Sequence, residues 1–220
     1  MRLRLLPDRR YRDREHAGRV LAEALDAFTG RPDVIVLALP RGGVDVAAPI
    51  AERLRAPLDV CLVHKLGVPG WPEVAAGAIG EDGALVVNDD VVRESGTTDA
   101  DLTRAIDAAR TELRRRQTLY RHDRPPAAVA GKTVLIVDDG VATGATMAAA
   151  LRTLRRRSVA GAVVAVPTGP SEVADLFPDA DRVVCPDRPG YFVGVSAAYD
   201  DFPQLTDARV ADVLARFAPE

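Results

Sequence analysis

Short apolar runs alternate with amphipathic stretches along most of the chain, and this alternation constrains the fold more than any other feature. In segment 13–28 apolar residues recur at helical spacing, and 34–39 then reads VIVLAL with no polar residue. Unbroken apolar runs are typical of strands covered on both faces of a sheet. Further strands are expected at 58–65, 133–137, 160–167 and 181–186, and further helices at 44–54, 99–120 and 146–156. The order predicts an α/β fold with a doubly wound, mostly parallel sheet.

Length and composition favour one domain over residues 1–220, with 186–220 as a small C-terminal hood or tail. The chain has 220 residues, 47% of them hydrophobic, which is enough for a substantial core. Its net charge of −3 gives no general attraction to nucleic acid or to an anionic membrane. Residues 1–10 lack the apolar centre of a signal peptide, and no run is long enough to span a bilayer. We therefore expect a soluble cytoplasmic protein with no nucleic-acid or membrane partner.

The segment VLIVDDGVATGAT, residues 134–146, places two acids after an apolar strand and a Thr-rich turn before a helix. In a parallel sheet, ligands bind beyond the carboxyl ends of the strands. The turn would offer backbone N–H groups and hydroxyls to an anion. Adjacent carboxylates would accept hydrogen bonds from a vicinal diol, so a ribose 5-phosphate suits the segment. The alternative is a solvated turn whose Asp or Thr caps the helix.

The same segment resembles the phosphoribosyl pyrophosphate signature of the type I phosphoribosyltransferases. The shared pattern is four apolar residues, two acids and a loop ending in Thr-Gly-x-Thr. The similarity extends over most of residues 10–210, including ALPRGGVDVAAPIAERL and HKLGVPGWPEVAAGAIGEDG. It implies transfer of a 5-phosphoribosyl group from phosphoribosyl pyrophosphate to a nitrogen of an unidentified base, with release of pyrophosphate. It also implies Mg²⁺ as cofactor and a homodimer.

The resemblance assigns roles to individual residues. Asp138 and Asp139 would orient the ribose, with Mg²⁺ reaching them through ribose hydroxyls or water. The rest of the loop would bind the donor and its 5-phosphate: Gly140, Val141, Ala142, Thr143, Gly144, Ala145 and Thr146. The pyrophosphate would be held by Arg41, Gly42, Gly43 and Lys65. Catalysis would come from Asp138, Asp139, Arg41 and Lys65 through positioning and electrostatics rather than through a nucleophile.

The turn PRGG also suits an anion on its own residues. Gly42 and Gly43 let backbone amides come close, and Arg41 supplies a fork of donors. An ordinary strand-to-helix turn with a surface arginine is the alternative. Lys65 would close the second strand on the same rim, whereas His64 would face the other side in a structural role.

Three further segments leave alternatives open. The stretch 66–75 holds two glycines and two prolines, so it is expected to be a loop: a lid closed by Trp71 and Glu73, or a plain surface loop. The arginine-rich helix 99–120 is interpreted as a solvated face rather than an RNA site. The tail aromatics would stack on an acceptor ring or anchor the tail to the sheet: Tyr191, Phe192, Tyr199 and Phe202.

One departure from the family concerns the acceptor. Purine-salvage members carry an acid where Ala142 stands, so hypoxanthine and guanine are disfavoured, although adenine-type members tolerate alanine there. The competing functional class is a regulatory protein that binds phosphoribosyl pyrophosphate or a nucleotide without turnover. Cys61 and Cys185 lie in apolar runs and are expected as buried, reduced thiols, with a disulfide as the alternative.

Overall fold

A five-stranded parallel sheet forms the centre of the molecule. The computed structural model describes residues 11–122 and 124–218, except the side chains of Pro72 and Glu73. The strand order is β2-β1-β6-β7-β8, and every neighbouring pair is parallel. The bounds are β1 (Val34–Ala38), β2 (Leu58–Val60), β6 (Thr133–Val137), β7 (Gly161–Ala165) and β8 (Arg182–Val184). The predicted parallel α/β sheet is confirmed.

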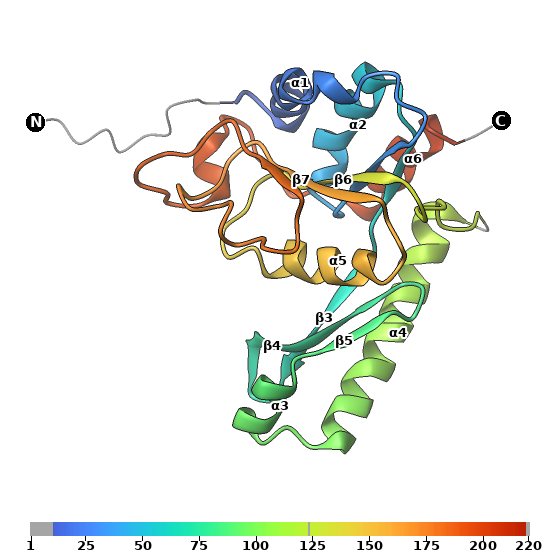
Figure 1. Cartoon of the computed structure of the whole chain (residues 1–220), viewed down its shortest axis with the longest axis vertical. Helices are drawn as coiled ribbons and strands as arrows, with labels where there is room; N and C mark the ends of the chain where they lie inside the picture. Colours follow the sequence, from blue (N-terminus) through green and yellow to red (C-terminus); the bar gives the residue numbers. More distant parts are fainter. Residues whose placement is uncertain (1–10, 123, 219–220) are drawn as a thin grey trace, which may run out of the picture.

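Helices cover both faces of this sheet, as Figure 1 shows. One face carries α1 (Arg14–Ala24), α2 (Gly43–Leu54) and α6 (Asp207–Arg216). The other face carries α5 (Ala145–Arg155). Short 3-10 turns are present as η1 (Asp26–Phe28) and η2 (Val195–Ala198). Helix α1 begins where predicted, because the Asp13 side chain accepts the N–H of His16 at 2.6 Å and caps the first turn.

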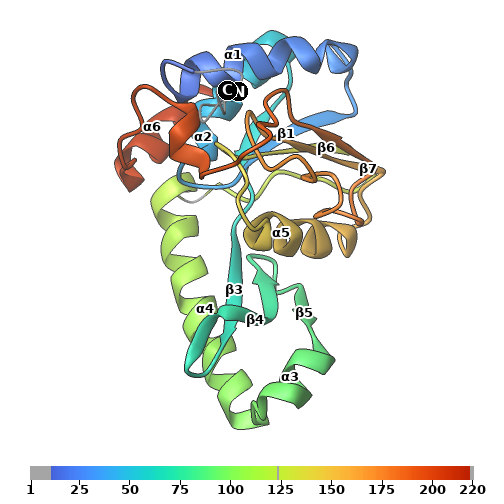
Figure 2. The ribbon, with the colours of Figure 1, turned by 90° about the vertical axis from the view of Figure 1, so that its left-hand side faces the viewer.

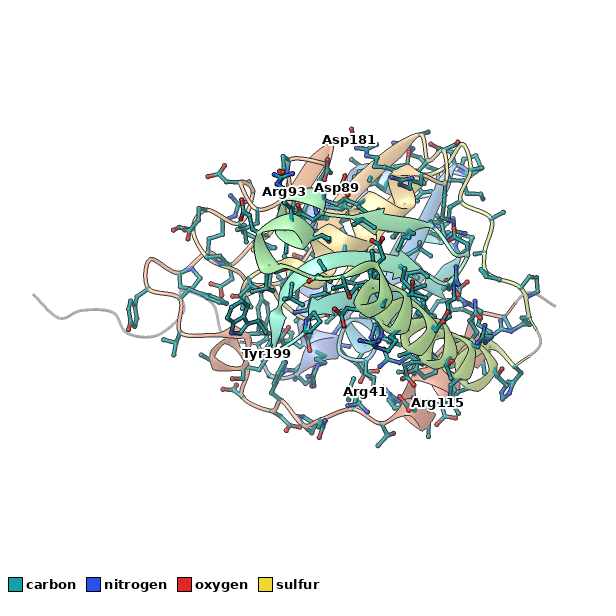
Figure 3. The ribbon with its side chains drawn as sticks, turned by 90° about the horizontal axis from the view of Figure 1, so that it is seen from below. Arg41, Asp89, Arg93, Arg115, Asp181 and Tyr199 are labelled. Atoms are coloured by element: carbon teal, nitrogen blue, oxygen red, sulfur yellow. The ribbon has the colours of Figure 1, made fainter. Side chains whose placement is uncertain are left out.

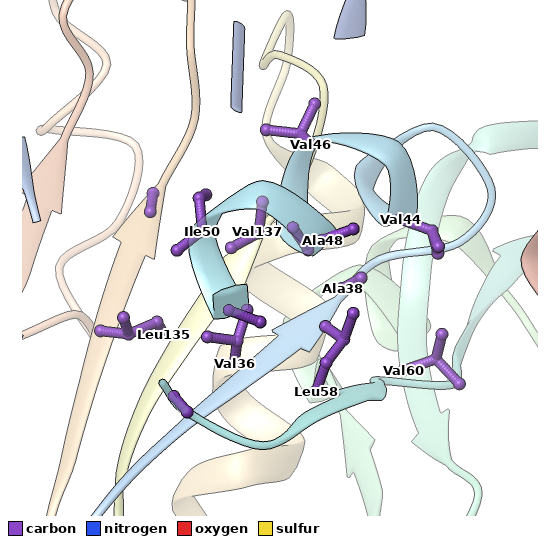
Figure 4. Packing of buried hydrophobic residues seen from close by; sticks show 14 of the residues in the cluster. Val36, Ala38, Val44, Val46, Ala48, Ile50, Leu58, Val60, Leu135 and Val137 are labelled. Carbon is purple, nitrogen blue, oxygen red and sulfur yellow. The ribbon is translucent and has the colours of Figure 1, made fainter. Parts of the chain in front are cut away.

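The strands are apolar on both sides because each side packs against helices. Val36 and Ala38 face α2, where they meet Val44, Val46 and Ile50, while Ile35 and Leu37 belong to the cluster around α5. Figure 4 shows the first of these layers, with Leu135 and Val137 of β6 beside Val36. This packing fixes the carboxyl ends of β1 and β6 side by side.

A second unit, built from the middle of the chain, lies apart from the parallel sheet (Figure 2). It contains an antiparallel sheet in the order β3-β4-β5, made of β3 (Val63–Val68), β4 (Trp71–Gly80) and β5 (Leu85–Val87). Two helices complete it, α3 (Asp89–Ser95) and the long α4 (Asp99–Arg121). The segments AGAIG and ALVVN, whose short apolar runs are typical of a hairpin, form the β4–β5 pair.

Two predictions in this region are wrong. Segment 58–65 is not one strand: residues 58–60 pair with β1, whereas residues 63–65 belong to the second sheet. Segment 66–75 is not a loop, because β3 and β4 occupy most of it. Its glycines and prolines serve a hairpin instead: Gly70 takes φ 81° in the turn, and Gly67 sits at a shift in strand register. The lid hypothesis itself stays a prediction, and the Glu73 side chain lies outside the described residues.

The tail contains a helix that the sequence analysis did not expect. Helix α6 buries Val210, Val213 and Leu214 in the main core and contacts α2 and α4. Whether segment 186–220 acts as a hood over substrate stays a prediction. The prediction that no signal peptide is present concerns residues 1–10, which lie outside the described residues. Over the part of the chain that is described, no helix is both long and apolar enough to cross a bilayer.

Candidate functional site

The two motifs from the sequence meet at one edge of the parallel sheet. Ala38 and Val137 are register partners, so the PRGG turn after β1 lies beside the two acids that follow β6. A Cβ added to Gly42 would lie 2.0 Å from Oδ2 of Asp139, and one added to Gly43 would lie 2.5 Å from the Val137 carbonyl oxygen. Both positions therefore require glycine for close packing. The Pro40–Arg41 peptide bond is cis.

The loop behind the acids is open to an anion. Ala142, Thr143 and Thr146 are exposed, and Gly144 precedes α5 with φ 73°. A Cβ on Gly144 would contact the Phe177 ring at 2.9 Å, which adds to the strain of the left-handed backbone. No side chain within the described residues caps α5. The first amides of this helix can therefore donate to a ligand, and the helix dipole favours a negative charge there.

The two acids lie in a desolvated environment. Burial raises the pKa of Asp138 well above its usual value, and the neighbouring Asp139 carboxylate raises it further. Burial also raises the pKa of Asp139, while a hydrogen bond from Arg14 opposes that rise. Oδ1 of Asp138 accepts the Asp139 N–H at 2.8 Å, which orients the first carboxylate. Holding two acids here is costly for the fold, as is common at functional sites.

Arg14 is a site residue that the sequence analysis missed. Its Nε donates to Oδ2 of Asp139 at 2.8 Å, and its Nη1 donates to the Pro203 carbonyl at 2.8 Å. The guanidinium lies 3.7 Å from the centre of the Phe202 ring. The side chain is only 8% exposed, so the ion pair with Asp139 is well shielded. An arginine in an amphipathic helix gives no sequence signal of a partner 125 residues away.

The four tail aromatics fall into two groups, one packed beside the acids and one lining a pocket. The Tyr199 hydroxyl donates to the Asp139 carbonyl, and its ring packs on Phe202 at 4.7 Å. Both therefore anchor the tail beside the acids. By contrast, Tyr191 is 62% exposed and lines a pocket of about 340 Å³ with Phe192, Glu172 and Ala142. These two aromatics are placed where a ring could stack against them.

Arg41 and Lys65 come from different parts of the fold. Arg41 is exposed, and its Nη1 lies 3.9 Å from Oδ1 of Asp207 in α6, close to Arg115 (Figure 3). Such an exposed pair leaves the guanidinium free to turn towards a ligand. Lys65 lies within β3 rather than at the end of a parallel strand. It nevertheless lines a pocket of about 370 Å³ with Pro40 and Thr146, so it borders both motifs.

The same pocket contains His64 and Arg116, which the sequence analysis placed elsewhere. His64 was expected on the face opposite Lys65, but both residues line this pocket, because β3 belongs to the second sheet. Burial lowers the pKa of His64, and Arg116 lowers it further. Arg116 pairs with Glu112 at 2.7 Å, one of several ion pairs along α4 that neutralise its arginines.

The next features are possible metal ligands and the two cysteine thiols. Within residues 11–122 and 124–218, no group of three or more His, Cys, Asp or Glu side chains could hold a metal ion. Cys61 and Cys185 are free and buried, as expected. Burial raises the pKa of Cys61 to about 12 and that of Cys185 to about 11, so both are protonated at neutral pH.

A parallel α/β sheet with a pair of acids, an open loop behind them and a glycine turn beside them defines a protein of the phosphoribosyltransferase class. The chain matches the phosphoribosyl transferase domain family over residues 13–200, and it belongs to that family. It is 45% identical over 205 residues to a Mycobacterium tuberculosis protein named "Putative phosphoribosyl transferase". That alignment covers 93% of this chain and 46% of the relative, so the chain spans about half the length of the curated relatives it matches. The crystal structure of a Thermus thermophilus protein, TT1426, is similar with a TM-score of 0.85 and 44% identity, covering 96% of this chain and 100% of that one.

Proposed function

We propose that this chain transfers a 5-phosphoribosyl group from phosphoribosyl pyrophosphate to a nitrogen of a base and releases pyrophosphate. The observation that carries the proposal is the contact between the two motifs. Gly42 lies against the carboxylate of Asp139, so a pyrophosphate on the PRGG turn and a ribose on the acids would be adjacent. That is the arrangement in which the bond between C1 of the sugar and the pyrophosphate oxygen would break.

The leaving group would be held by Arg41, Lys65 and the Gly42 N–H. Gly43 contributes differently from expectation, because its N–H already donates to the Leu39 carbonyl at 3.1 Å. Its part is to permit the close approach of β6. Cationic donors aimed at the departing oxygens stabilise the charge that develops on them.

The ribose would lie on Asp138 and Asp139. Arg14 occupies one oxygen of Asp139, which leaves its other oxygen and Oδ2 of Asp138 to accept the 2- and 3-hydroxyls. The 5-phosphate would bind the exposed loop at Ala142–Thr146 and the first amides of α5. Negative charge beneath the ring would also favour the cationic sugar of the transition state.

Mg²⁺ fits this site only when it binds together with phosphoribosyl pyrophosphate. The two acids, one of them paired with Arg14, are too few to hold the ion alone. We propose that Asp138 and Asp139 meet the ion through ribose hydroxyls or water. When bound, Mg²⁺ would neutralise the charge of the pyrophosphate leaving group.

The acceptor base would enter the pocket beside Ala142. Tyr191 and Phe192 offer faces for stacking, and Glu172 is the one carboxylate among the residues that line it. This lining favours a ring that presents N–H groups to the carboxylate. The family also suggests a homodimer in the cytoplasm, and light scattering of the purified chain tests the dimer.

The test is pyrophosphate release from phosphoribosyl pyrophosphate and Mg²⁺ across a panel of purine, pyrimidine and pyridine bases. We expect release to depend on at least one base and to fall when Glu172 is replaced by Gln. Donor binding without base-dependent release from any member of the panel would contradict the transferase proposal. That result would favour the regulatory alternative, a sensor of the donor.

A further inference from the structure

A larger pocket, of about 720 Å³, lies at the opposite end of the parallel sheet from the phosphoribosyl site. Ile35 and Leu58 line it at the starting ends of β1 and β2, and Lys132 lines it just before β6. The acids and the PRGG turn follow the other ends of β1 and β6. The pocket is therefore outside the transfer site, and its volume is in the range of small-molecule sites.

Most of the lining is apolar. Helix α6 contributes Leu214, Phe217 follows the helix, and the linker after α4 contributes Pro125, Pro126 and two alanines. Figure 1 shows the upper end of α4 and this linker next to α6. Such a lining would bury the body of an apolar ligand, whereas a highly hydrated ion alone would gain little from it.

The charged residues of the pocket are mainly cations. Arg55, Arg124 and Lys132 line it, and none of them has an ion-pair partner in the described part of the chain. The one acid in the lining, Asp59, is already bonded by Arg121 through a 2.7 Å contact to Nε. The pocket therefore combines an apolar wall with an unbalanced positive charge.

The pocket is held in shape without a ligand. Arg121, which is 2% exposed, bonds Asp59 and Glu81, and the second oxygen of Asp59 accepts the Ala127 N–H at 2.9 Å. This buried network fixes the linker over the sheet edge. A pre-formed site avoids the cost of ordering the linker when a ligand binds.

Arg55 reaches the pocket from the end of α2. It ends α2 with φ 52° and ψ 41°, a left-handed conformation that glycine adopts more easily. Arg55 lines the pocket from this position and brings its positive charge to the wall.

We infer that this pocket binds an amphipathic anion, with an apolar body against α6 and the linker and a carboxylate or phosphate head at Arg55, Arg124 and Lys132. The site is separate from the donor site, so its occupation does not depend on the proposed transferase reaction.

The test is calorimetric titration of the whole chain with decanoate, decyl phosphate, decanol and inorganic phosphate. We expect one molecule of decanoate or decyl phosphate to bind per chain. The tighter of the two shows whether the natural head group is a carboxylate or a phosphate. Decanol and inorganic phosphate should each bind at least about tenfold more weakly, because each lacks one half of the recognised chemistry. Equal binding of decanol, or of phosphate alone, would overturn the inference.

Variants locate the binding. Arg55→Gln with Arg124→Gln should weaken decanoate binding by about tenfold or more, while Arg93→Gln, at an exposed arginine of α3 in the second unit, should leave it unchanged. Ala128→Trp should fill the pocket and abolish binding with all cations in place. Thermal melting would confirm that each variant is folded. Unchanged affinity in the double variant or in Ala128→Trp would refute the site.

Discussion

Asp138 illustrates at the scale of one residue how function and stability compete in this protein. Its carboxylate is desolvated and lies next to a second acid, yet the fold keeps both at the end of β6. The native state therefore binds the Asp138 proton more tightly than the unfolded chain does. The resulting cost to stability is full above the raised pKa and is relieved as the pH falls through it.

Replacing Asp138 by Asn should therefore stabilise the free protein at neutral pH. We expect a gain of about 1 kcal/mol, the usual size for removing a functional liability. Urea unfolding should show this gain shrinking as the pH falls through the raised pKa of Asp138, because the wild-type carboxyl then takes up its proton in the native state. A variant less stable than wild type at neutral pH would show that the carboxylate supports the fold.

Position 42 requires glycine because of the space available, not because of charge. An alanine Cβ would overlap Oδ2 of Asp139, which Arg14 holds in place. Gly42→Ala should cost about 1–3 kcal/mol in unfolding free energy and disrupt the Arg14–Asp139 pair. Gly161→Ala is the matched control, since its Cβ would make only ordinary contacts at 3.6 Å. Equal stability of the two variants would contradict the packing argument.

At the scale of elements, α4 is tied to the parallel sheet by a buried ion network. Arg121 bonds Asp59 in β2, Glu81 after β4 and the Val60 carbonyl. The network joins the second unit to the sheet, and so fixes β3 with Lys65 beside the phosphate loop. Its acids would be left buried and uncompensated without the arginine.

Arg121→Met should destabilise the chain by about 3–5 kcal/mol, because it strands two buried acids. Arg110→Ala is the comparison, as Arg110 forms only an exposed pair with Asp107 at 3.6 Å and should cost less than about 1 kcal/mol. Denaturant unfolding of both variants measures the difference. Similar losses would mean that the buried network contributes no more than a surface pair.

How far the sequence predicts these elements depends on how local their signals are. The apolar runs of β1, β6 and β7 identified the parallel strands, because their burial on both faces leaves an unbroken pattern. The hairpin of β3 and β4 was read as a loop, since Pro69 and Gly70 signal a turn without showing that strands flank it. Helix α6 has only three buried apolar residues, too short a pattern to separate from the tail.

At the scale of the whole molecule, folding brings together residues whose partners no single sequence could reveal. Residues 40–43 and 138–146 were predicted as one site from the family resemblance, and the parallel strands β1 and β6 bring them to a common edge. The contacts of Arg14 and Tyr199 with Asp139 could not be foreseen, because they depend on where α1 and the tail meet after folding. Tyr11 and Tyr199 form a parallel bridge that joins the segment before α1 to the tail.

Titration of phosphoribosyl pyrophosphate with Mg²⁺ into the wild type and into Asp138→Asn/Asp139→Asn tests whether the two acids bind the donor. The double variant removes the acceptors for the sugar diol, so affinity should fall about 100-fold while the fold is retained. Asp212→Asn, at an exposed carboxylate on α6, should leave affinity unchanged. Wild-type affinity in the double variant would contradict the assignment of this sheet edge as the phosphoribosyl site.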